Sequence, residues 1–273
     1  MRSLWLNWQG KRLILNLQKE LDVVLATIKK ASKIVMEYYH GDFNINLKAD
    51  NSEVTDADLA SNKLIVSSLK ENFPDYAILS EENKDDLTRI NCDFCFIVDP
   101  LDGTKDFVNR TNHFAINIAL SYKHEIVLGV ISIPVLGLVY YASKGNGAYK
   151  IEKGKTMKIK VRHKDDDLLL LESNFFLKGK ERFENNPLIG KIEHYGSSLK
   201  ACLIAEGKAD LCVKYDQGSK EWDTAPSEII IREAGGIMTD GRGIPIRYNK
   251  EDVYNHSGFI IATSLKIVDQ FKL

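Results

Sequence analysis

The 273-residue sequence lacks the features of membrane-spanning, secreted and nucleic-acid-binding proteins. No uncharged apolar run approaches the roughly 18 residues needed to cross a bilayer. The first twelve residues hold an apolar run too short and too interrupted for a signal peptide. Lys and Arg number 37 against 38 Asp and Glu, so there is no basic excess to attract nucleic acid polymers. We therefore expect a globular, cytoplasmic protein, monomeric or homodimeric, with no membrane insertion; peripheral membrane association stays open.

Cysteine is scarce, with four residues in the chain. Cys92 and Cys95 form a C-x-x-C pair, which invites a redox or zinc interpretation. The pair lies in an apolar, strand-like run, whereas redox pairs usually begin a helix. Cys202 and Cys212 are too far apart to supply the second half of a zinc knuckle. We interpret all four as buried small apolar residues, and thiol labelling of the folded protein tests the redox alternative.

Hydrophobic periodicity predicts two helices and several strands in the first part of the chain. Apolar residues at helical spacing predict a helix over residues 18–39. A second helix follows Thr55, with Leu59, Ile65 and Leu69 facing the core. Short apolar runs predict strands, the third of them half-buried: Ala77–Ser80, Phe94–Val98, Phe114–Leu120, Ile126–Ile133 and Leu138–Ala142.

A charge run at residues 164–167 is expected to link two halves of the chain. We assign residues 1–163 to an N-terminal α+β half and residues 164–273 to a C-terminal α/β half. In the second half strands and helices alternate, which predicts a layered arrangement. The elements expected there are strands Leu168–Leu171, Leu211–Val213 and Phe259–Ala262, a helix from Ser197 to Gly207, and a helix after Asp223.

Acidic residues directly follow two neighbouring predicted strands. Glu81 follows one strand, and Asp99 and Asp102 follow the next. Carboxylates that converge at strand ends repel one another unless cations lie between them, and hard oxygen ligands suit Mg²⁺. Gly103 lets the backbone approach a ligand closely, and Thr104 begins a short helix whose free N–H groups can bind a phosphate.

Each acid also has a purely structural interpretation. Asp102 can be a turn residue or a helix cap, and Asp223 can be the N-cap of the helix that follows it. Asp58, three residues after Thr55, can be the acidic partner of a capping box. The segment at residues 99–105 favours the functional interpretation, because acid-Pro-x-acid-Gly-Thr is a specific combination.

Together these motifs resemble those of the inositol monophosphatase superfamily, whose members are magnesium-dependent, lithium-sensitive phosphatases. The resemblance covers roughly residues 20–265, in the family's order. The matching segments are Val54-Thr-x-x-Asp58, Glu81-Glu82, Asp99-Pro-Leu-Asp-Gly-Thr104 and Trp222-Asp223. The resemblance implies an α+β fold layered as an αβαβα sandwich, with the site between the two halves and two or three Mg²⁺ ions in it.

The resemblance also implies roles for individual residues. The family's motifs place two groups of metal ligands on the sequence, with one carboxylate shared between them. The first group is Glu81, Asp99 and the carbonyl of Leu101, and the second is Asp99, Asp102 and Asp223. Asp58 and Thr104 match the pair that orients and deprotonates the attacking water, so no covalent nucleophile is required.

Within the superfamily, the sequence is most similar to 3′(2′),5′-bisphosphate nucleotidases, enzymes of sulfur metabolism that convert 3′-phosphoadenosine 5′-phosphate to AMP. Residues 102–107 and 196–200 carry this likeness. It implies a phosphorylated nucleotide as substrate, bound through Gly103, Thr104, Ser197, Lys200, Lys214 and Asp223. The sequence departs from the pattern in two places: Lys214 stands where related nucleotidases usually have arginine, and residues 171–174 replace a segment that often contains a Ser-His pair.

Two other functions stay open. One is a phosphatase of inositol 1-phosphate or another small sugar phosphate that uses the same metal site. The other is a catalytically silent binding protein. A silent homologue has no need of the complete set that the sequence carries, namely Asp58, Glu81, Asp99, Asp102, Thr104 and Asp223.

Overall fold

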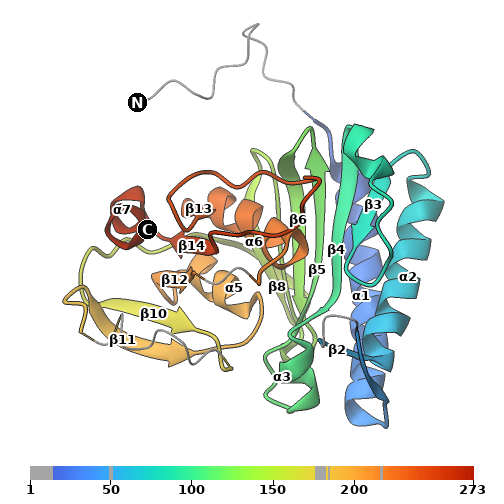
Figure 1. Ribbon diagram of the computed structural model, residues 1–273, viewed down its shortest axis with the longest axis horizontal. Coiled ribbons are helices and arrows are strands. Elements are labelled where there is room, and N and C mark those ends of the chain that lie inside the picture. Colours follow the sequence, from blue (N-terminus) through green and yellow to red (C-terminus); the bar gives the residue numbers. More distant parts are fainter. Residues whose placement is uncertain (1–14, 49–51, 176–182, 184, 216–217) are drawn as a thin grey trace, which may run out of the picture.

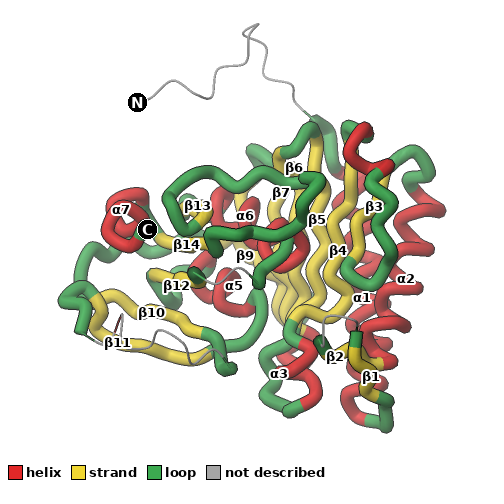
Figure 2. Tube along the Cα trace, viewed as in Figure 1, coloured by secondary structure: helices red, strands yellow, loops and turns green. Residues whose placement is uncertain are grey.

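The computed structural model describes residues 15–48, 52–175, 183, 185–215 and 218–273. Two β-sheets lie side by side with helices outside and between them (Figure 1, Figure 2). A separate pair of antiparallel strands is formed by β1 (Ile45–Leu47) and β2 (Glu53–Thr55). Among the described residues, no helix has both the length and the apolar character of a membrane span.

The larger sheet has the strand order β3-β4-β5-β6-β7-β8-β9, in which only the β3–β4 pair is parallel. Its strands are β3 (Ala77–Ser80), β4 (Phe94–Asp102), β5 (Ala115–Tyr122), β6 (Glu125–Ile133), β7 (Leu138–Ser143), β8 (Gly147–Glu152) and β9 (Lys155–Ile159). The short helices η1 (Thr88–Asn91), α3 (Thr104–Val108) and η2 (Pro134–Leu136) lie in its connections. The sequence analysis did not predict β8 and β9.

The smaller sheet has the order β11-β10-β12-β14-β13. Its strands are β10 (Leu168–Glu172), β11 (Ile189–His194), β12 (Leu211–Lys214), β13 (Ile237–Asp240) and β14 (Phe259–Ala262). The chain passes from one sheet to the other through residues 160–167. The division into domains at residues 163 and 164 stays a prediction.

The helices complete five layers (Figure 1). Helices α1 (Gln18–His40) and α2 (Asp56–Asn72) pack their apolar faces on the larger sheet. Helices α5 (Leu199–Ala205) and α6 (Glu221–Glu233) lie between the two sheets. Helix α7 (Leu265–Phe271) covers the outer face of the smaller sheet. The αβαβα sandwich expected from the sequence is therefore confirmed.

The structure corrects several predicted details. β5 is buried on both faces rather than half-buried, because α1 covers one side and α6 the other. Leu59 is 47% exposed, whereas Ile65 and Leu69 are buried as predicted. β4 continues past Val98 to Asp102, so the acidic motif ends the strand instead of following it. The helix predicted from Ser197 to Gly207 is shorter, and corresponds to α5.

All four cysteines are free thiols. Cys95, Cys202 and Cys212 are buried, as expected of small apolar residues, and Cys92 is half-buried. Burial raises the pKa of the Cys95 thiol to about 12, which keeps it protonated at neutral pH. Cys95 therefore does not supply the reactive thiolate that redox chemistry needs.

Close packing of α6 on the larger sheet determines where its first turn lies. Gly129 on β6 faces the helix, and a Cβ atom there would lie 2.6 Å from Cγ2 of Ile229 and 2.8 Å from Cα of Pro226. The absence of a side chain lets the helix backbone approach the strand directly. This contact places the N-terminus of α6 at the end of β4.

Candidate active site

Three of the predicted metal ligands meet where β4 ends and α6 begins. Asp99, Asp102 and Asp223 each offer a carboxylate oxygen, and these oxygens lie within 4.8 Å of one another. The pairing of β4 with β5 shifts register between Asp99 and Asp102. Asp223 lies in the first turn of α6, which begins at Glu221 and not after Asp223 as the sequence analysis had it.

The acid cluster has more negative charge than the protein around it neutralises. Burial raises the pKa of Asp99 well above its usual range, and the charges of Glu81, Asp102 and Asp223 raise it further. Burial and the charge of Asp102 raise the pKa of Asp223 to about 7. Closely spaced carboxylates that are hard to ionise are stabilised by a cation, and oxygen-only donors suit a hard divalent ion. The cluster could therefore bind a metal.

Hydrogen bonds fix Asp102 and connect β4 to α5. Its Oδ2 accepts from the backbone N–H of Ser198 at 2.7 Å and from the Ser198 hydroxyl at 2.6 Å. The side-chain amide of Asn117 donates to the same oxygen at 3.2 Å. Burial raises the pKa of Asp102, although the Ser198 bond opposes the shift. The sequence analysis missed Ser198 and Asn117, because no local pattern connects them with Asp102.

Asn117 also explains why α6 can begin before a proline. Pro226 lies inside the helix and has no N–H to donate to the carbonyl of Trp222, four residues earlier. The side-chain amide of Asn117 donates to that carbonyl at 3.4 Å. Asp223 caps the same turn, because its Oδ2 accepts from the backbone N–H of Lys220 at 2.7 Å. Asp223 thus caps the helix and belongs to the acid cluster.

Asp58 is at once the predicted cap and the predicted partner of Thr104. Its Oδ2 accepts from the backbone N–H of Thr55 at 2.8 Å and from the Thr55 hydroxyl at 2.5 Å. Its Oδ1 accepts from the Thr104 hydroxyl at 3.1 Å. The same hydroxyl lies 3.4 Å from the carbonyl oxygen of Leu101, another predicted ligand. Burial raises the pKa of Asp58, which makes the carboxylate a stronger base.

Glu81 lies outside the three-acid cluster and is paired with a lysine. The Lys48 ammonium lies 3.0 Å from Oε1 of Glu81 and 2.5 Å from Oε1 of Glu82. Although burial disfavours its charged form, the two carboxylates raise the pKa of Lys48 above its usual value. Lys48 directly follows β1, and nothing in the sequence connected it with these acids.

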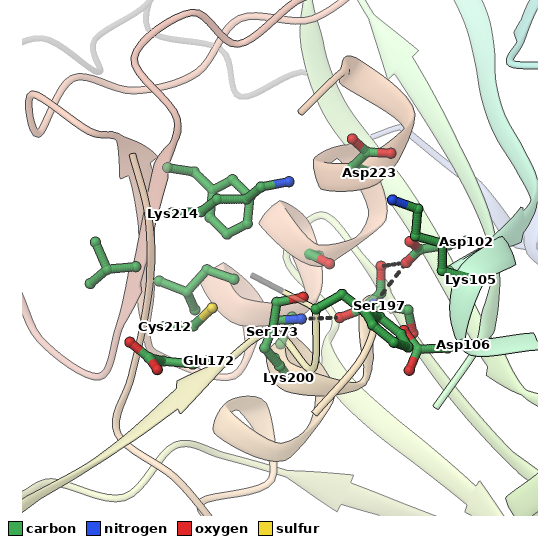
Figure 3. Close-up of a pocket in the computed structure, with 18 of the residues that line it drawn as sticks. Asp102, Lys105, Asp106, Glu172, Ser173, Ser197, Lys200, Cys212, Lys214 and Asp223 are labelled. Atoms are coloured by element: carbon green, nitrogen blue, oxygen red, sulfur yellow. Dashed lines mark hydrogen bonds between the residues drawn. The ribbon is translucent and has the colours of Figure 1, made fainter. Parts of the chain in front are cut away.

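A pocket of about 600 Å³ adjoins the acid cluster and is lined by all six predicted substrate residues. Figure 3 shows Asp102 and Asp223 on one side of the pocket and Glu172 and Cys212 on the opposite side, with Lys200 between them and Lys214 extending from the Cys212 side toward Asp223. The predicted metal ligands and substrate residues that line the pocket are Glu81, Asp102, Gly103, Thr104, Ser197, Lys200, Lys214 and Asp223.

Ser197 and Lys200 line the pocket in different ways. The Ser197 hydroxyl oxygen is buried and has no hydrogen-bond partner, and Ser197 has a positive φ of 48°. The Lys200 ammonium donates to the carbonyls of Tyr195 and Ser197 at 3.1 and 3.0 Å. Burial lowers the pKa of Lys200. Lys200 therefore holds the Ser197 turn in place, a role that the sequence analysis did not foresee.

Part of the pocket lining is apolar. It includes Val213 on β12, Met238 on β13, and Phe259 and Ile261 on β14. Such a surface can accommodate a flat or aliphatic part of a ligand whose charged part lies at the acids. These residues look like ordinary core strands in the sequence, so nothing there marked them as pocket residues.

The raised pKa values predict how the stability of the metal-free protein depends on pH. A carboxyl whose folded pKa is about 7, against an ordinary value of 3.8, stabilises the fold while it is protonated, and this contribution is lost as the pH rises through the folded pKa. We expect the melting temperature of the wild type, measured in a chelator, to fall between about pH 4 and 7 relative to that of Asp223→Asn, and the difference to stay constant above pH 7. The difference at pH 8 should be roughly 5 °C or more. Parallel curves for the two proteins would show that Asp223 does not titrate in this range.

Comparison with known protein families, sequences and solved structures finds relatives that belong to one family. The model of the inositol monophosphatase family matches residues 16–270. The chain is 35% identical over 247 residues to the 3′(2′),5′-bisphosphate nucleotidase CysQ of Aggregatibacter actinomycetemcomitans, covering 88% of this chain and 91% of the relative. It is 33% identical to CysQ of Escherichia coli K12, covering 89% and 99%. Among solved structures, CysQ from Bacteroides thetaiotaomicron is 33% identical with a TM-score of 0.79, covering 92% of this chain and all of the other. The suhB protein of Bartonella henselae is 25% identical with a TM-score of 0.78, covering 92% and 96%.

Proposed function

Because the chain belongs to the inositol monophosphatase family, we propose that it is a metal-dependent 3′(2′),5′-bisphosphate nucleotidase that hydrolyses 3′-phosphoadenosine 5′-phosphate to AMP and phosphate in the cytoplasm. The observation that carries the proposal is that one pocket is lined by two of the clustered acids, by two lysines and by a serine whose hydroxyl has no hydrogen-bond partner (Figure 3). Relatives that carry this name match the chain along most of its length.

The proposed cofactor is Mg²⁺, with two or three ions in the site. We assign one ion to Glu81, Asp99 and the carbonyl of Leu101, and a second to Asp99, Asp102 and Asp223. The donors fit, because all are oxygens and the charge of Asp102 raises the pKa of both Asp99 and Asp223. When bound, the ions neutralise phosphoryl oxygens and make a coordinated water more acidic.

Asp58 and Thr104 are the proposed pair that prepares the attacking water. The Thr104 hydroxyl donates a hydrogen bond to Oδ1 of Asp58, so the hydroxyl oxygen is free to accept a hydrogen bond from a water molecule. The cap bonds from Thr55 hold the other carboxylate oxygen and fix the orientation of the group. Asp58 can then take up the proton that the water loses as it attacks phosphorus. The leaving group is the 3′-oxygen of the ribose.

The non-reacting 5′-phosphate is assigned to Ser197 and Lys214, with Lys200 beside them. The Ser197 hydroxyl is a buried donor without a partner, which is costly unless a ligand satisfies it. The amine of Lys214 is directed across the pocket toward the side that holds Asp223 (Figure 3). Two of the Lys200 N–H groups are used by backbone carbonyls, which leaves the third for the phosphate. The apolar surface formed by β12 and β14 then receives the nucleoside.

We expect the catalytic efficiency, kcat/KM, to be at least tenfold higher with 3′-phosphoadenosine 5′-phosphate than with inositol 1-phosphate. Only the bisphosphate can bind the acid cluster and the lysines at the same time, and a charge-assisted contact contributes about 1.5–3 kcal/mol. That energy corresponds to roughly tenfold or more in discrimination. Phosphate release from both compounds under identical Mg²⁺ conditions gives the ratio. A preference for inositol 1-phosphate would favour the sugar-phosphate alternative and overturn the nucleotidase assignment.

Replacing Lys214 with alanine tests the same assignment on one side chain. We expect Lys214→Ala to lower kcat/KM for the bisphosphate roughly tenfold or more and to change kcat/KM for inositol 1-phosphate less than about twofold. The control is Lys208→Ala, which removes a lysine that is 60% exposed and paired with Glu206 outside the pocket. Equal losses on both substrates would mean that Lys214 supports the fold or the acid cluster rather than the second phosphate.

A further inference from the structure

A chain of buried polar side chains connects the two segments that carry Glu81 and Asp223. Arg89 lies in η1, shortly after Glu81, and is only 3% exposed. Its Nε and Nη2 donate to Oδ2 of Asp85 at 3.0 and 2.7 Å. Its Nη1 donates to Oδ1 of Asn249, 160 residues along the chain, at 2.8 Å. The Arg89 guanidinium thus joins the segment after β3 to a loop of the second half.

Asn249 continues the connection in both directions. Its side-chain amide donates back to the carbonyl of Arg89 at 3.0 Å, so the two residues are joined by two bonds. Its backbone N–H donates to Oε2 of Glu221 at 2.6 Å, and the next N–H, of Lys250, donates to Oε1 at 2.8 Å. Asn249 is 2% exposed and has a positive φ of 54°, a conformation that asparagine tolerates better than most residues.

Glu221 joins this hydrogen-bonded chain to α6, the helix that carries Asp223. It is fully buried and is the first residue of α6, two residues before Asp223. Both of its carboxylate oxygens are used by backbone N–H groups, and its own N–H donates to the carbonyl of Val253 at 2.9 Å. The first turn of α6, which presents Asp223, is therefore bonded to the loop at residues 249–253.

Stability alone is a weak reason for such an arrangement. Moving charges out of water is costly, and well-packed apolar side chains in place of a buried ionic network often give equal or greater stability. What the hydrogen bonds add to apolar packing is a directional constraint on the relative position of two backbone segments, because hydrogen bonds are directional and dispersion contacts are not. Here the two segments are those that follow Glu81 and precede Asp223.

We propose that Glu221, Asn249 and Arg89 are positioning residues that hold the first turn of α6 in register with the end of β3 and thereby set the affinity of the acid cluster for its divalent cation. The inference rests on the metal site of the proposed function. None of the three residues is assigned to the metal or the substrate. They act through the placement of Asp223 relative to Glu81.

Two variants of the full-length protein test this proposal. Glu221→Gln replaces one of two acceptor oxygens by a donor and so breaks the bond from α6 to one backbone N–H. Asn249→Gly removes both side-chain bonds to Arg89 but keeps the backbone N–H and suits the positive φ. Asp210→Asn is the matched control, because Asp210 is fully buried and accepts from the Arg162 guanidinium and from the N–H of Leu169.

The measurement is direct titration with Mn²⁺, followed by electron paramagnetic resonance, in the absence of substrate. We expect both variants to bind Mn²⁺ about tenfold more weakly than the wild type. At saturating Mg²⁺ their kcat should stay within roughly threefold of the wild-type value. Asp210→Asn should lose a similar amount of thermal stability and keep the wild-type Mn²⁺ affinity.

Several outcomes overturn the inference. Unchanged Mn²⁺ affinity in folded Glu221→Gln and Asn249→Gly would show that the connection does not act on the cluster. An equal loss in Asp210→Asn would show that any buried polar defect has the same effect. If Glu221→Gln does not fold, Asn249→Gly decides alone. If the wild type binds no Mn²⁺, both the metal site and the inference are overturned. If the wild type binds Mn²⁺ and the variants bind it equally well, only the inference is overturned.

Discussion

Asp99→Asn should lower Mg²⁺-dependent phosphate release by roughly a thousandfold or more and at the same time raise the melting temperature of the metal-free protein. Asp99 is the carboxylate assigned to both metal ions, and removing its charge takes several kcal/mol from metal-assisted transition-state stabilisation. In the metal-free protein the same charge is buried and repelled by Glu81, Asp102 and Asp223. A neutral amide of nearly the same shape removes this repulsion.

Phosphate release at increasing Mg²⁺, together with thermal unfolding in a chelator, measures both effects. Asp210→Asn serves again as the control, because its carboxylate is fully buried but paired with Arg162. That variant should lose stability and keep its Mg²⁺-dependent activity. Near-normal activity of Asp99→Asn at saturating Mg²⁺ would contradict the metal assignment. Lower stability of the metal-free variant would contradict the electrostatic description of the cluster.

Asp58→Asn should lower kcat by about 10²–10⁴-fold, the usual contribution of a general base, and leave the Mn²⁺ affinity within about twofold. An asparagine can keep its oxygen toward the Thr55 cap, which then turns its NH₂ group toward the Thr104 hydroxyl. Thr104 would accept from the amide instead of donating to a carboxylate. The water would lose both its proton acceptor and its orienting oxygen.

The matched control is Asp56→Asn, in the same first turn of α2. Asp56 accepts from the backbone N–H and the side chain of Asn44, so it is also a structural acid, but it is not joined to Thr104. We expect Asp56→Asn to keep kcat within about threefold of the wild type. If Asp58→Asn instead binds Mn²⁺ much more weakly at an unchanged maximal rate, Asp58 acts as a metal ligand or only as a cap.

The sequence predicted those parts of the site whose signal is local. Asp99 and Asp102 share one short segment with Gly103 and Thr104, and the resemblance to a known family fixed Asp58 and Asp223 beside them. Asp58 is the capping-box acid that its structural interpretation predicted, but Asp223 is not the N-cap that was predicted: it is the third residue of α6, and Lys220 is the N-cap. Each uses one oxygen to cap a helix, Asp58 at the Thr55 turn and Asp223 at Lys220. A capping residue has a fixed orientation, which is what a site needs.

Residues that depend on long-range packing could not be predicted. Lys48 lies 33 residues from Glu81, and Arg89 lies 160 residues from Asn249. No periodicity or spacing connects such pairs. The start of α6 was misplaced for a related reason. Proline is common in the first turn of a helix, so Pro226 indicated a helix that begins just before it. The side-chain amide of Asn117, on β5, donates to the carbonyl that the proline leaves without a backbone donor.

The burial of β5 was underestimated because alternation of large and small residues was taken for alternation of buried and exposed faces. Ala115, Asn117 and Ala119 are fully buried although they are small or polar. They face α6, which packs closely on this side of the sheet, as Gly129 on the next strand also shows. A small residue on a strand can mark close approach of a helix as well as exposure to solvent.

The most direct test is to identify the products formed from 3′-phosphoadenosine 5′-phosphate. The purified protein is incubated with the compound in Mg²⁺ and, separately, in an excess of chelator, and the nucleotides are separated by chromatography beside standards of AMP and adenosine 3′-phosphate. We expect AMP and one equivalent of phosphate with Mg²⁺ and no conversion in the chelator. Formation of adenosine 3′-phosphate, or hydrolysis that continues without a divalent cation, would contradict metal-dependent cleavage at the 3′ position.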